Sequence, residues 1–160
     1  MTSRQFFVVL NRLKKTHGFT LIEMMVVVAI VGILSSVAYP SFMSQIRKSR
    51  RSDAVAAMSG VQQAQERWRA NNPNYVTTTS LITTTAPDGL GLTSLTTPGG
   101  YYLLSLSTNA TTGCTTGSCY TAKATAVLEK SQASDLGCTS LTVNVTNGNA
   151  TKLPDVCWSK

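Results

Sequence analysis

The sequence predicts an α+β chain, in which one long N-terminal helix packs the second half of its length on an antiparallel β-sheet head. Three observations support this prediction. Residues 19–39 form an apolar run with one charge, and a helical apolar pattern continues as far as Trp68. Beyond residue 100, apolar and Thr residues alternate in short segments. All four cysteines lie in the last third of the 160-residue chain, where disulfides can brace a small head.

The apolar run has the length of a membrane span. Its 21 residues, with Glu23 as the single charge, reach about 31 Å as a helix, which matches the hydrocarbon core of a bilayer. Residues 1–18 before it are basic and are expected to be a leader peptide. The apolar core of a secretory signal is only about 7–15 residues long and ends at a small-residue cleavage site, which does not follow here. We therefore predict a retained transmembrane helix over 19–39.

Charge patterning concerns both orientation and partners. The formal net charge is +7, but four basic residues belong to residues 1–18, and the ten others against seven acids leave +3. The basic balance is thus largely a leader property and does not by itself indicate nucleic-acid binding. The run is followed by a second basic group, so the positive-inside rule gives nearly a tie. The expected disulfides decide the orientation, because disulfides form outside the cytoplasm and therefore place the head there. The second group is Arg47, Lys48, Arg50 and Arg51.

The second half of the helix is expected over residues 40–72. Pro40 should end or kink the first stretch, and residues 41–71 contain no proline and one glycine. Apolar and small residues recur there every three or four positions, while Asn71-Asn72-Pro73 is a stop signal. If both halves are helical, they form one rod of about 53 residues and about 80 Å. The expected apolar stripe is Ala54, Ala57, Met58, Val61, Ala64, Gln65 and Trp68, opposite a charged face with Arg50, Arg51, Asp53, Glu66 and Arg69.

The head is expected over residues 73–160. Residues 73–100 are a long Thr-, Gly- and Pro-rich connection, whose structure the sequence does not predict. Strands are expected over 101–106, 119–127 and 141–145. Asn147-Gly148 is a type I′ hairpin signal, which predicts a short fourth strand over 150–153.

Catalytic and metal sites are not expected. The sole histidine, His17, lies in the leader, and no cysteine pair has CxxC spacing, so we expect no zinc site. The chain has no Ser/His/Asp set, phosphate-binding glycine loop or carboxylate cluster. We expect a protein without enzymatic activity and without a cofactor.

The start of the apolar run carries a specific resemblance. Gly18-Phe19-Thr20-Leu21-Ile22-Glu23, followed by the run and Pro40, resembles the type IV pilin signature. The resemblance implies the type IV pilin fold and cleavage after Gly18 by a prepilin peptidase. It also implies N-methylation of Phe19 as the new N-terminus and a role for Glu23 in subunit docking. The freed Phe19 amine is a cation one helical turn from Glu23, and pairing the two would offset the cost of an acid in a membrane span.

The four cysteines allow three pairings, of which we expect Cys114–Cys119 and Cys138–Cys157. The first pair brackets a tight turn between two expected strands. The second closes a loop of about 20 residues, stabilises by about 3 kcal/mol, and resembles the C-terminal disulfide-bonded loop of pilins. The segment 135–142 and the terminal Cys157-Trp158 look like minor pilins of the PilE type. An adhesive role for this loop is an alternative to a purely stabilising one.

The leading hypothesis is a structural subunit, a minor pilin of a type IV pilus. The resemblance implies membrane lipid as the surroundings before assembly, and a bacterial inner-membrane precursor with a periplasmic head that later joins an extracellular fibre. The implied partners are other pilin subunits, the prepilin peptidase and methyltransferase, and an inner-membrane assembly platform. Two alternatives remain open. One is a DNA-binding pilin with a head patch of Lys123, Lys130, Lys152 and Lys160, and the other is a type II secretion pseudopilin.

Overall fold

The computed structural model describes residues 18–108 and 117–158. Within them, one long helix, α1 (Leu21–Arg69), precedes a four-stranded antiparallel sheet, and the predicted α+β fold class is confirmed. The chain divides into two compact units, Met1–Pro40 and Ser41–Lys160. Because α1 contributes to both, we call residues 41–160 the head and describe each unit by itself.

Helix α1 does not end at Pro40, which lies inside it. A proline removes one backbone hydrogen bond from a helix, and here the flanking residues on both sides remain helical. The helix ends at Arg69, slightly before the predicted boundary at residue 72. Asn72 explains this end, because its side-chain amide donates a hydrogen bond to the Trp68 carbonyl at 3.0 Å and caps the last turn.

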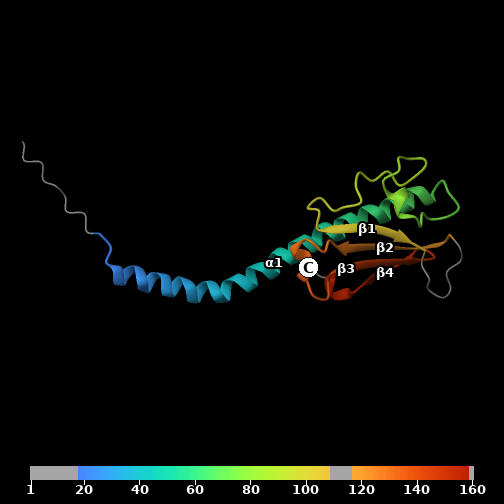
Figure 1. Ribbon diagram of the computed structural model, residues 1–160. Helices are drawn as coiled ribbons and strands as arrows, with labels where there is room; N and C mark the ends of the chain where they lie inside the picture. The colour runs from blue at the N-terminus through green and yellow to red at the C-terminus, as the bar shows by residue number, and fades with distance from the viewer. Residues whose placement is uncertain (1–17, 109–116, 159–160) are drawn as a thin grey trace, which may run out of the picture. The chain divides into compact units, whose positions relative to one another are not determined.

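The sheet has the strand order β1-β2-β3-β4, all antiparallel, as Figure 1 shows. The strands are β1 (Tyr102–Ser107), β2 (Cys119–Ala126), β3 (Ser140–Thr146) and β4 (Asn149–Leu153), each close to its expected position. Asn147 and Gly148 connect β3 to β4 with φ values of 50° and 83°. Both angles are positive, as a type I′ turn requires, so this hairpin follows directly from its two turn residues.

The core of the head lies between α1 and one face of the sheet. The alternation along β3 buries Leu141, Val143 and Val145 and leaves the residues between them half-exposed. The facing stripe of α1 buries five of the seven predicted residues, whereas Ala57 and Trp68 are only partly buried. Alanines at 122, 124 and 126 of β2 leave room for the helix, and Tyr102 and Tyr120 fill the remaining space. Strand β4 is an exposed edge strand.

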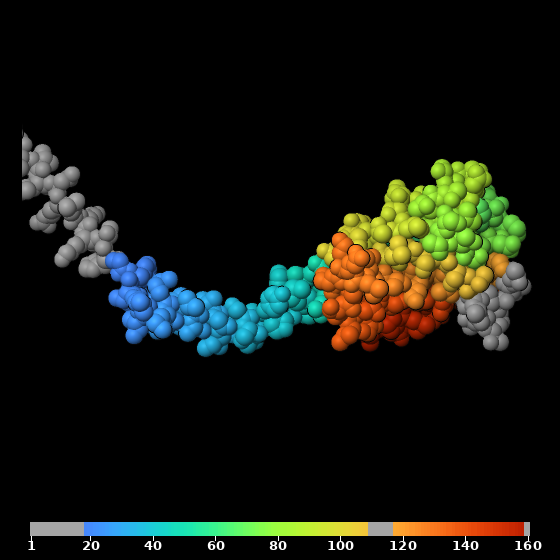
Figure 2. Space-filling model, viewed as in Figure 1, coloured from blue at the N-terminus to red at the C-terminus, as the bar shows by residue number. Residues whose placement is uncertain are grey.

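The connection 73–100 is more ordered than its composition indicates. It contains a 3-10 turn, η1 (Thr79–Ile82), and an isolated bridge between Thr96 and Leu103. Gln65 of α1 holds the start of this connection, because its amide accepts from Val76 N at 3.0 Å and donates to Val76 O at 2.6 Å. Figure 2 shows this yellow-green segment covering part of the head surface beside β1.

Candidate functional site

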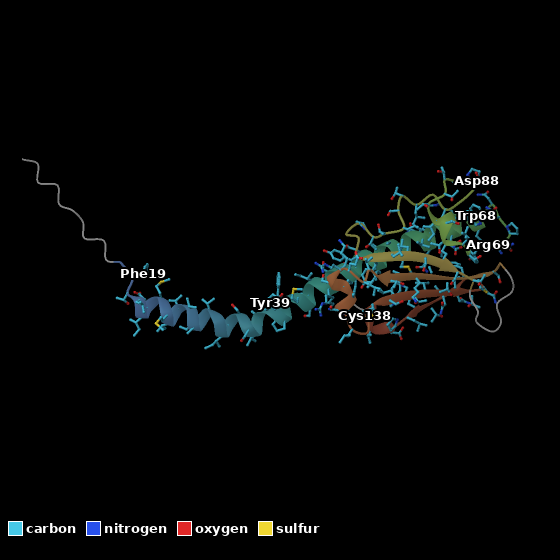
Figure 3. All side chains as sticks on the ribbon, in the orientation of Figure 1. Phe19, Tyr39, Trp68, Arg69, Asp88 and Cys138 are labelled. Carbon is cyan, nitrogen blue, oxygen red and sulfur yellow. A yellow bond between two sulfur atoms is a disulfide. The ribbon has the colours of Figure 1, made fainter. Side chains whose placement is uncertain are left out.

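The expected processing junction is exposed. The side chain of Phe19 is 79% exposed, and a Cβ added at Gly18 would meet no atom within 4 Å. Figure 3 labels Phe19 at the start of the helical ribbon. The uncut chain therefore offers this peptide bond to an enzyme without steric obstruction from the described residues.

Glu23 lies in the first turn of α1, next to a helix cap. Its backbone N–H donates to Thr20 Oγ1 at 3.2 Å, so Thr20 caps the helix and Glu23 occupies the third helical position. The pattern Thr20-x-x-Glu23 is a local sequence signal for this cap. From the sequence we predict a membrane span and a docking acid here, but not the cap. Among the described residues Glu23 forms no ion pair, so its carboxylate is available to a group outside them.

The first half of α1 exposes nearly all of its apolar side chains. An 18-residue window of the helix has a mean hydropathy of 2.4, and none of it is buried. By length and composition the helix can cross a membrane. A surface so apolar is stable only against lipid or other apolar helices.

In the head, a polar network joins α1 to the segment before Cys138. Arg51 binds Asp135 through two hydrogen bonds, Nε to Oδ2 and Nη2 to Oδ1, both 2.6 Å long. Gln132 Nε2 donates to Asp135 Oδ2 at 2.7 Å and to the Tyr102 hydroxyl at 2.8 Å. Tyr102 in turn donates to the Cys138 carbonyl at 3.2 Å. The hydrogen bonds to Asp135 raise the pKa of Arg51 above its ordinary value, so the guanidinium stays charged.

This network gives Arg51, which the sequence places on the charged face opposite the apolar stripe, a buried partner. Arg51 is mostly covered and Asp135 is buried, and 84 residues separate them in the chain. No local pattern indicates such a pair. Arg50 is similarly engaged, because its guanidinium lies 3.9 Å from the centre of the Tyr101 ring and donates to Ser131 Oγ.

The disulfide between Cys138 and Cys157, the second expected pair, closes the C-terminal loop. It joins the Arg51 network to the chain end, because the Cys138 N–H donates to the Asp135 carbonyl at 2.9 Å. Cys119 is also disulfide-bonded, and its expected partner Cys114 lies outside the described residues. Figure 3 places Cys138 at one end of the sheet and Trp68 and Arg69 at the other.

The lysines expected to form one patch are not brought together. Lys123 pairs with Thr142 on the outer face of the sheet, whereas Lys152 pairs with Val143, whose side chain faces the core. Paired residues of antiparallel strands share a face, so these two lysines belong to opposite faces. Lys130 lies in a loop after β2, and Lys160 lies outside the described residues. Within the described chain, no group of three or more His, Cys, Asp or Glu could hold a metal ion.

Comparison with known families matches two consecutive parts of the chain. Residues 13–39 match the prokaryotic N-terminal methylation motif. Residues 40–142, more than half of the chain, match the family described as type IV minor pilin ComP, DNA uptake sequence receptor.

Three relatives show the range of similar proteins. The type II secretion system core protein G of Escherichia coli K12 is 36% identical over 64 residues, which cover 40% of this chain and 44% of that protein. The type IV major pilin protein PilA of Myxococcus xanthus is 38% identical over 61 residues, or 38% of this chain and 28% of its own. The type IV major pilin protein PilE1 of Neisseria gonorrhoeae is 39% identical over 71 residues, which cover 40% of this chain and 32% of that protein.

The aligned parts thus span less than half the length of each of these relatives. The minor-pilin model covers far more of the chain, and its match agrees with the helix-and-sheet fold, while the methylation motif covers the exposed apolar residues. The chain therefore belongs to the family of type IV minor pilins.

Proposed function

We propose that this protein is a structural subunit of a type IV pilus, without catalytic activity, that assembles through the apolar half of α1. The observation that carries the proposal is the exposed apolar surface of residues 19–39, which lies within the matched methylation motif. Before assembly this surface lies in the inner membrane with the head in the periplasm. In the fibre, it packs against the same helices of other pilin subunits.

The proposed mechanism begins with processing. A prepilin peptidase cuts the bond between Gly18 and Phe19, and the freed amine of Phe19 is N-methylated. In the uncut chain this nitrogen is an uncharged amide, so cleavage creates a cation one helical turn from Glu23. Pairing of this cation with Glu23, within a subunit or between neighbours, offsets the cost of burying either charge. An inner-membrane assembly platform then moves the subunit into the fibre, with Pro40 at the end of the packed segment.

The docking role of the Glu23 charge can be tested separately from the size of its side chain. Both Glu23→Gln and Glu23→Ala keep the hydrogen bond from the backbone N–H of residue 23 to Thr20 Oγ1. Glu23→Gln also keeps a side chain of similar size and removes only the charge. We expect both variants to be processed and both to be lost from sheared fibres, as measured by quantitative mass spectrometry. Normal incorporation of Glu23→Gln would refute the docking role.

The junction itself has a direct test. Gly18→Glu adds a side chain where nothing obstructs it, so it should leave the fold intact and block only recognition by the peptidase. The expected result is a chain that retains residues 1–18, and an unchanged mature mass would reject the junction. Mass spectrometry of wild-type fibres would also show the N-terminal residue and its methylation, and recovery of the chain only with a secretion apparatus would favour the pseudopilin alternative.

A second candidate function is DNA capture, which the description of the matched family favours. Lys123, Lys130 and Lys152 are exposed, but the sheet separates Lys123 from Lys152, so one continuous lysine patch is not the binding surface. The test is binding of the mature protein in a nonionic detergent to duplex DNA at increasing salt. Contacts with phosphates predict an affinity that falls steeply with salt, and absence of salt-sensitive binding removes this candidate.

A further inference from the structure

Two leucines of the head are more exposed than any other large apolar side chain in the described residues. Leu128 is 89% and Leu136 is 90% exposed, which exceeds even the side chains of the apolar span. A single exposed leucine is ordinary on a protein surface, so exposure alone indicates nothing. What distinguishes these two is how they are held and what surrounds them.

Both leucines lie at the tips of hydrogen-bonded turns. Leu128 follows Val127 in the turn closed by the bond from Lys130 N to Val127 O at 3.0 Å. Leu136 takes the same position in the turn closed by the bond from Cys138 N to Asp135 O at 2.9 Å. The second turn is braced by the Cys138–Cys157 disulfide and the Arg51–Asp135 pair. The fold therefore holds both apolar tips outward on hydrogen-bonded turns.

The segment that carries these turns packs on the first part of α1 within the head. Arg50 contacts Ser131 and the Tyr101 ring, and Gln132 Nε2 donates to the Arg47 carbonyl at 3.4 Å. Lys130 lies 5.8 Å from the centre of the same Tyr101 ring. Figure 2 shows the orange surface of this segment beside the cyan residues of α1. Leu128 and Leu136 thus share one end of the head with these helix residues.

This end of the head is basic. Its cations are Arg47, Lys48, Arg50 and Lys130, since Arg51 is neutralised by Asp135, and its other acids are Asp53, Glu129 and Asp155. The four cations exceed the three acids, and both Lys48 and Lys130 are exposed. An exposed apolar tip beside cations is the combination by which peripheral segments bind anionic bilayers.

Lys48 lies close in the chain to the proposed membrane span. Lys48 follows Pro40 by eight helical residues, a rise of at most about 12 Å. The headgroup layer extends about 5–8 Å beyond the hydrocarbon core on each side. A precursor anchored through residues 19–39 therefore keeps Lys48 within reach of the lipid headgroups, where cation attraction is least screened.

We propose that the head docks on an anionic phospholipid surface before assembly, through Lys48 and Lys130 with the turn tips Leu128 and Leu136. We call these four residues the lipid-facing surface. The proposal rests on the proposed membrane anchoring, and adds to it a second contact, made by the head. Docking would hold the head of the precursor against the membrane. The head would leave the lipid surface when the subunit enters the fibre.

The test uses the full mature chain reconstituted in vesicles of phosphatidylcholine, with or without phosphatidylglycerol. Hydrogen exchange measured by mass spectrometry should be several-fold slower over residues 127–137 when phosphatidylglycerol is present, and added salt should remove the part of this protection that comes from the lysines. Lys48→Gln and Lys130→Gln should each reduce the ratio of docked to undocked head about fivefold. Lys123→Gln, an exposed lysine on the outer face of the sheet, is the matched control and should change nothing. Leu128→Ser with Leu136→Ser should abolish the protection that salt does not remove.

Exchange over residues 21–39 is the internal reference. If this helix is not protected in either vesicle, the membrane anchoring itself is wrong. If it is protected while residues 127–137 exchange equally in both lipids, anchoring stands and head docking is overturned. Protection of 127–137 that needs no phosphatidylglycerol and grows with the protein-to-lipid ratio would also overturn it, and would indicate contact between copies of the chain.

Discussion

Tyr102 and Tyr120 are both fully buried in the sheet, yet their hydroxyl groups differ in their partners. The Tyr102 hydroxyl accepts from Gln132 and donates to the Cys138 carbonyl. The Tyr120 hydroxyl has no hydrogen-bond partner among the described residues, and its ring packs 5.0 Å from the ring of Tyr75. A buried hydroxyl without a partner costs free energy that a phenyl ring does not.

These two tyrosines form a matched pair of variants. Tyr102→Phe should lower the free energy of unfolding by about 1–2 kcal/mol, because it leaves a buried carbonyl without its donor. Tyr120→Phe should change it by less than about 0.5 kcal/mol, or raise it, since it removes a group with no bond to lose. Urea denaturation of each variant measures the difference. Equal losses for both would contradict this account of the two hydroxyl groups.

The same burial sets the response of the head to alkaline pH. Desolvation raises the pKa of Tyr102 and of Tyr120 above the ordinary value, and the pKa of Tyr75 rises for the same reason and through its bond to Glu66. The folded state holds these protons more tightly than the unfolded state. Their contribution to stability is therefore complete below about pH 10 and is lost as the pH rises through the raised folded values.

We expect the contribution of these tyrosines to the free energy of unfolding to stay constant up to about pH 10 and to decrease above it. Above this pH, the free energy of unfolding of Tyr120→Phe should decrease less steeply than that of the wild type, because one of the three tyrosines no longer ionises on unfolding. Denaturation midpoints measured across the alkaline range would show this. Parallel curves for variant and wild type would argue against burial of the Tyr120 hydroxyl in the folded head.

At the scale of elements, α1 and the connection 73–100 depend on one side chain. Gln65 is buried, and its amide makes both hydrogen bonds that a neighbouring strand would make to Val76. It thereby fixes where the chain leaves the helix and begins to cover the sheet. The stripe pattern places Gln65 on the apolar face, but a polar residue on such a stripe does not reveal its partner.

Gln65→Leu tests this attachment. It keeps the size of the side chain and leaves the Val76 N–H and carbonyl buried without partners, so we expect a loss of about 2–4 kcal/mol in the free energy of unfolding. Gln63→Ala, on the exposed side of the same turn, should stay within about 0.5 kcal/mol of the wild type. A loss for Gln65→Leu no larger than that of the control would show that the connection is held by its other contacts.

Elements differ in how far the sequence predicts them. The β3–β4 hairpin follows from Asn147-Gly148, because the turn type depends on two adjacent residues. The strands follow from the alternation of apolar and polar residues within short segments. The connection 73–100 could not be predicted, because its order comes from contacts with distant residues, such as the Thr79 hydroxyl, which accepts from Leu106 N at 2.9 Å and donates to Leu106 O at 3.1 Å.

At the scale of the molecule, the two units have different requirements. The head, residues 41–160, contains a complete core between α1 and the sheet. None of the 18-residue apolar stretch in the first half of α1 is buried within the chain, so this stretch needs lipid or other subunits around it. Folding of the head and anchoring of the chain are therefore separate properties.

A chain reduced to residues 41–160 should fold cooperatively without detergent. Its thermal midpoint should match that of the head in the detergent-solubilised mature protein, because the removed residues contribute no buried side chain to the core. Calorimetry and circular dichroism measure this. Loss of the cooperative transition in the shorter chain would show that the core depends on residues before 41.

The sequence by itself determined the apolar helix and the strand positions, because each depends on residue types at short or regular spacing. The junction before Phe19 stays a prediction from a local motif, and the Cys138–Cys157 pair was one of the pairings that four cysteines allow until the tertiary structure showed it. Only the tertiary structure decided that Arg51 pairs with Asp135, that Gln65 holds Val76, and that Lys123 and Lys152 lie on opposite faces of the sheet. These relations join residues far apart in the chain or depend on strand register. They arise when the sheet closes on the helix and brings distant side chains within hydrogen-bond distance, an outcome that no local pattern contains.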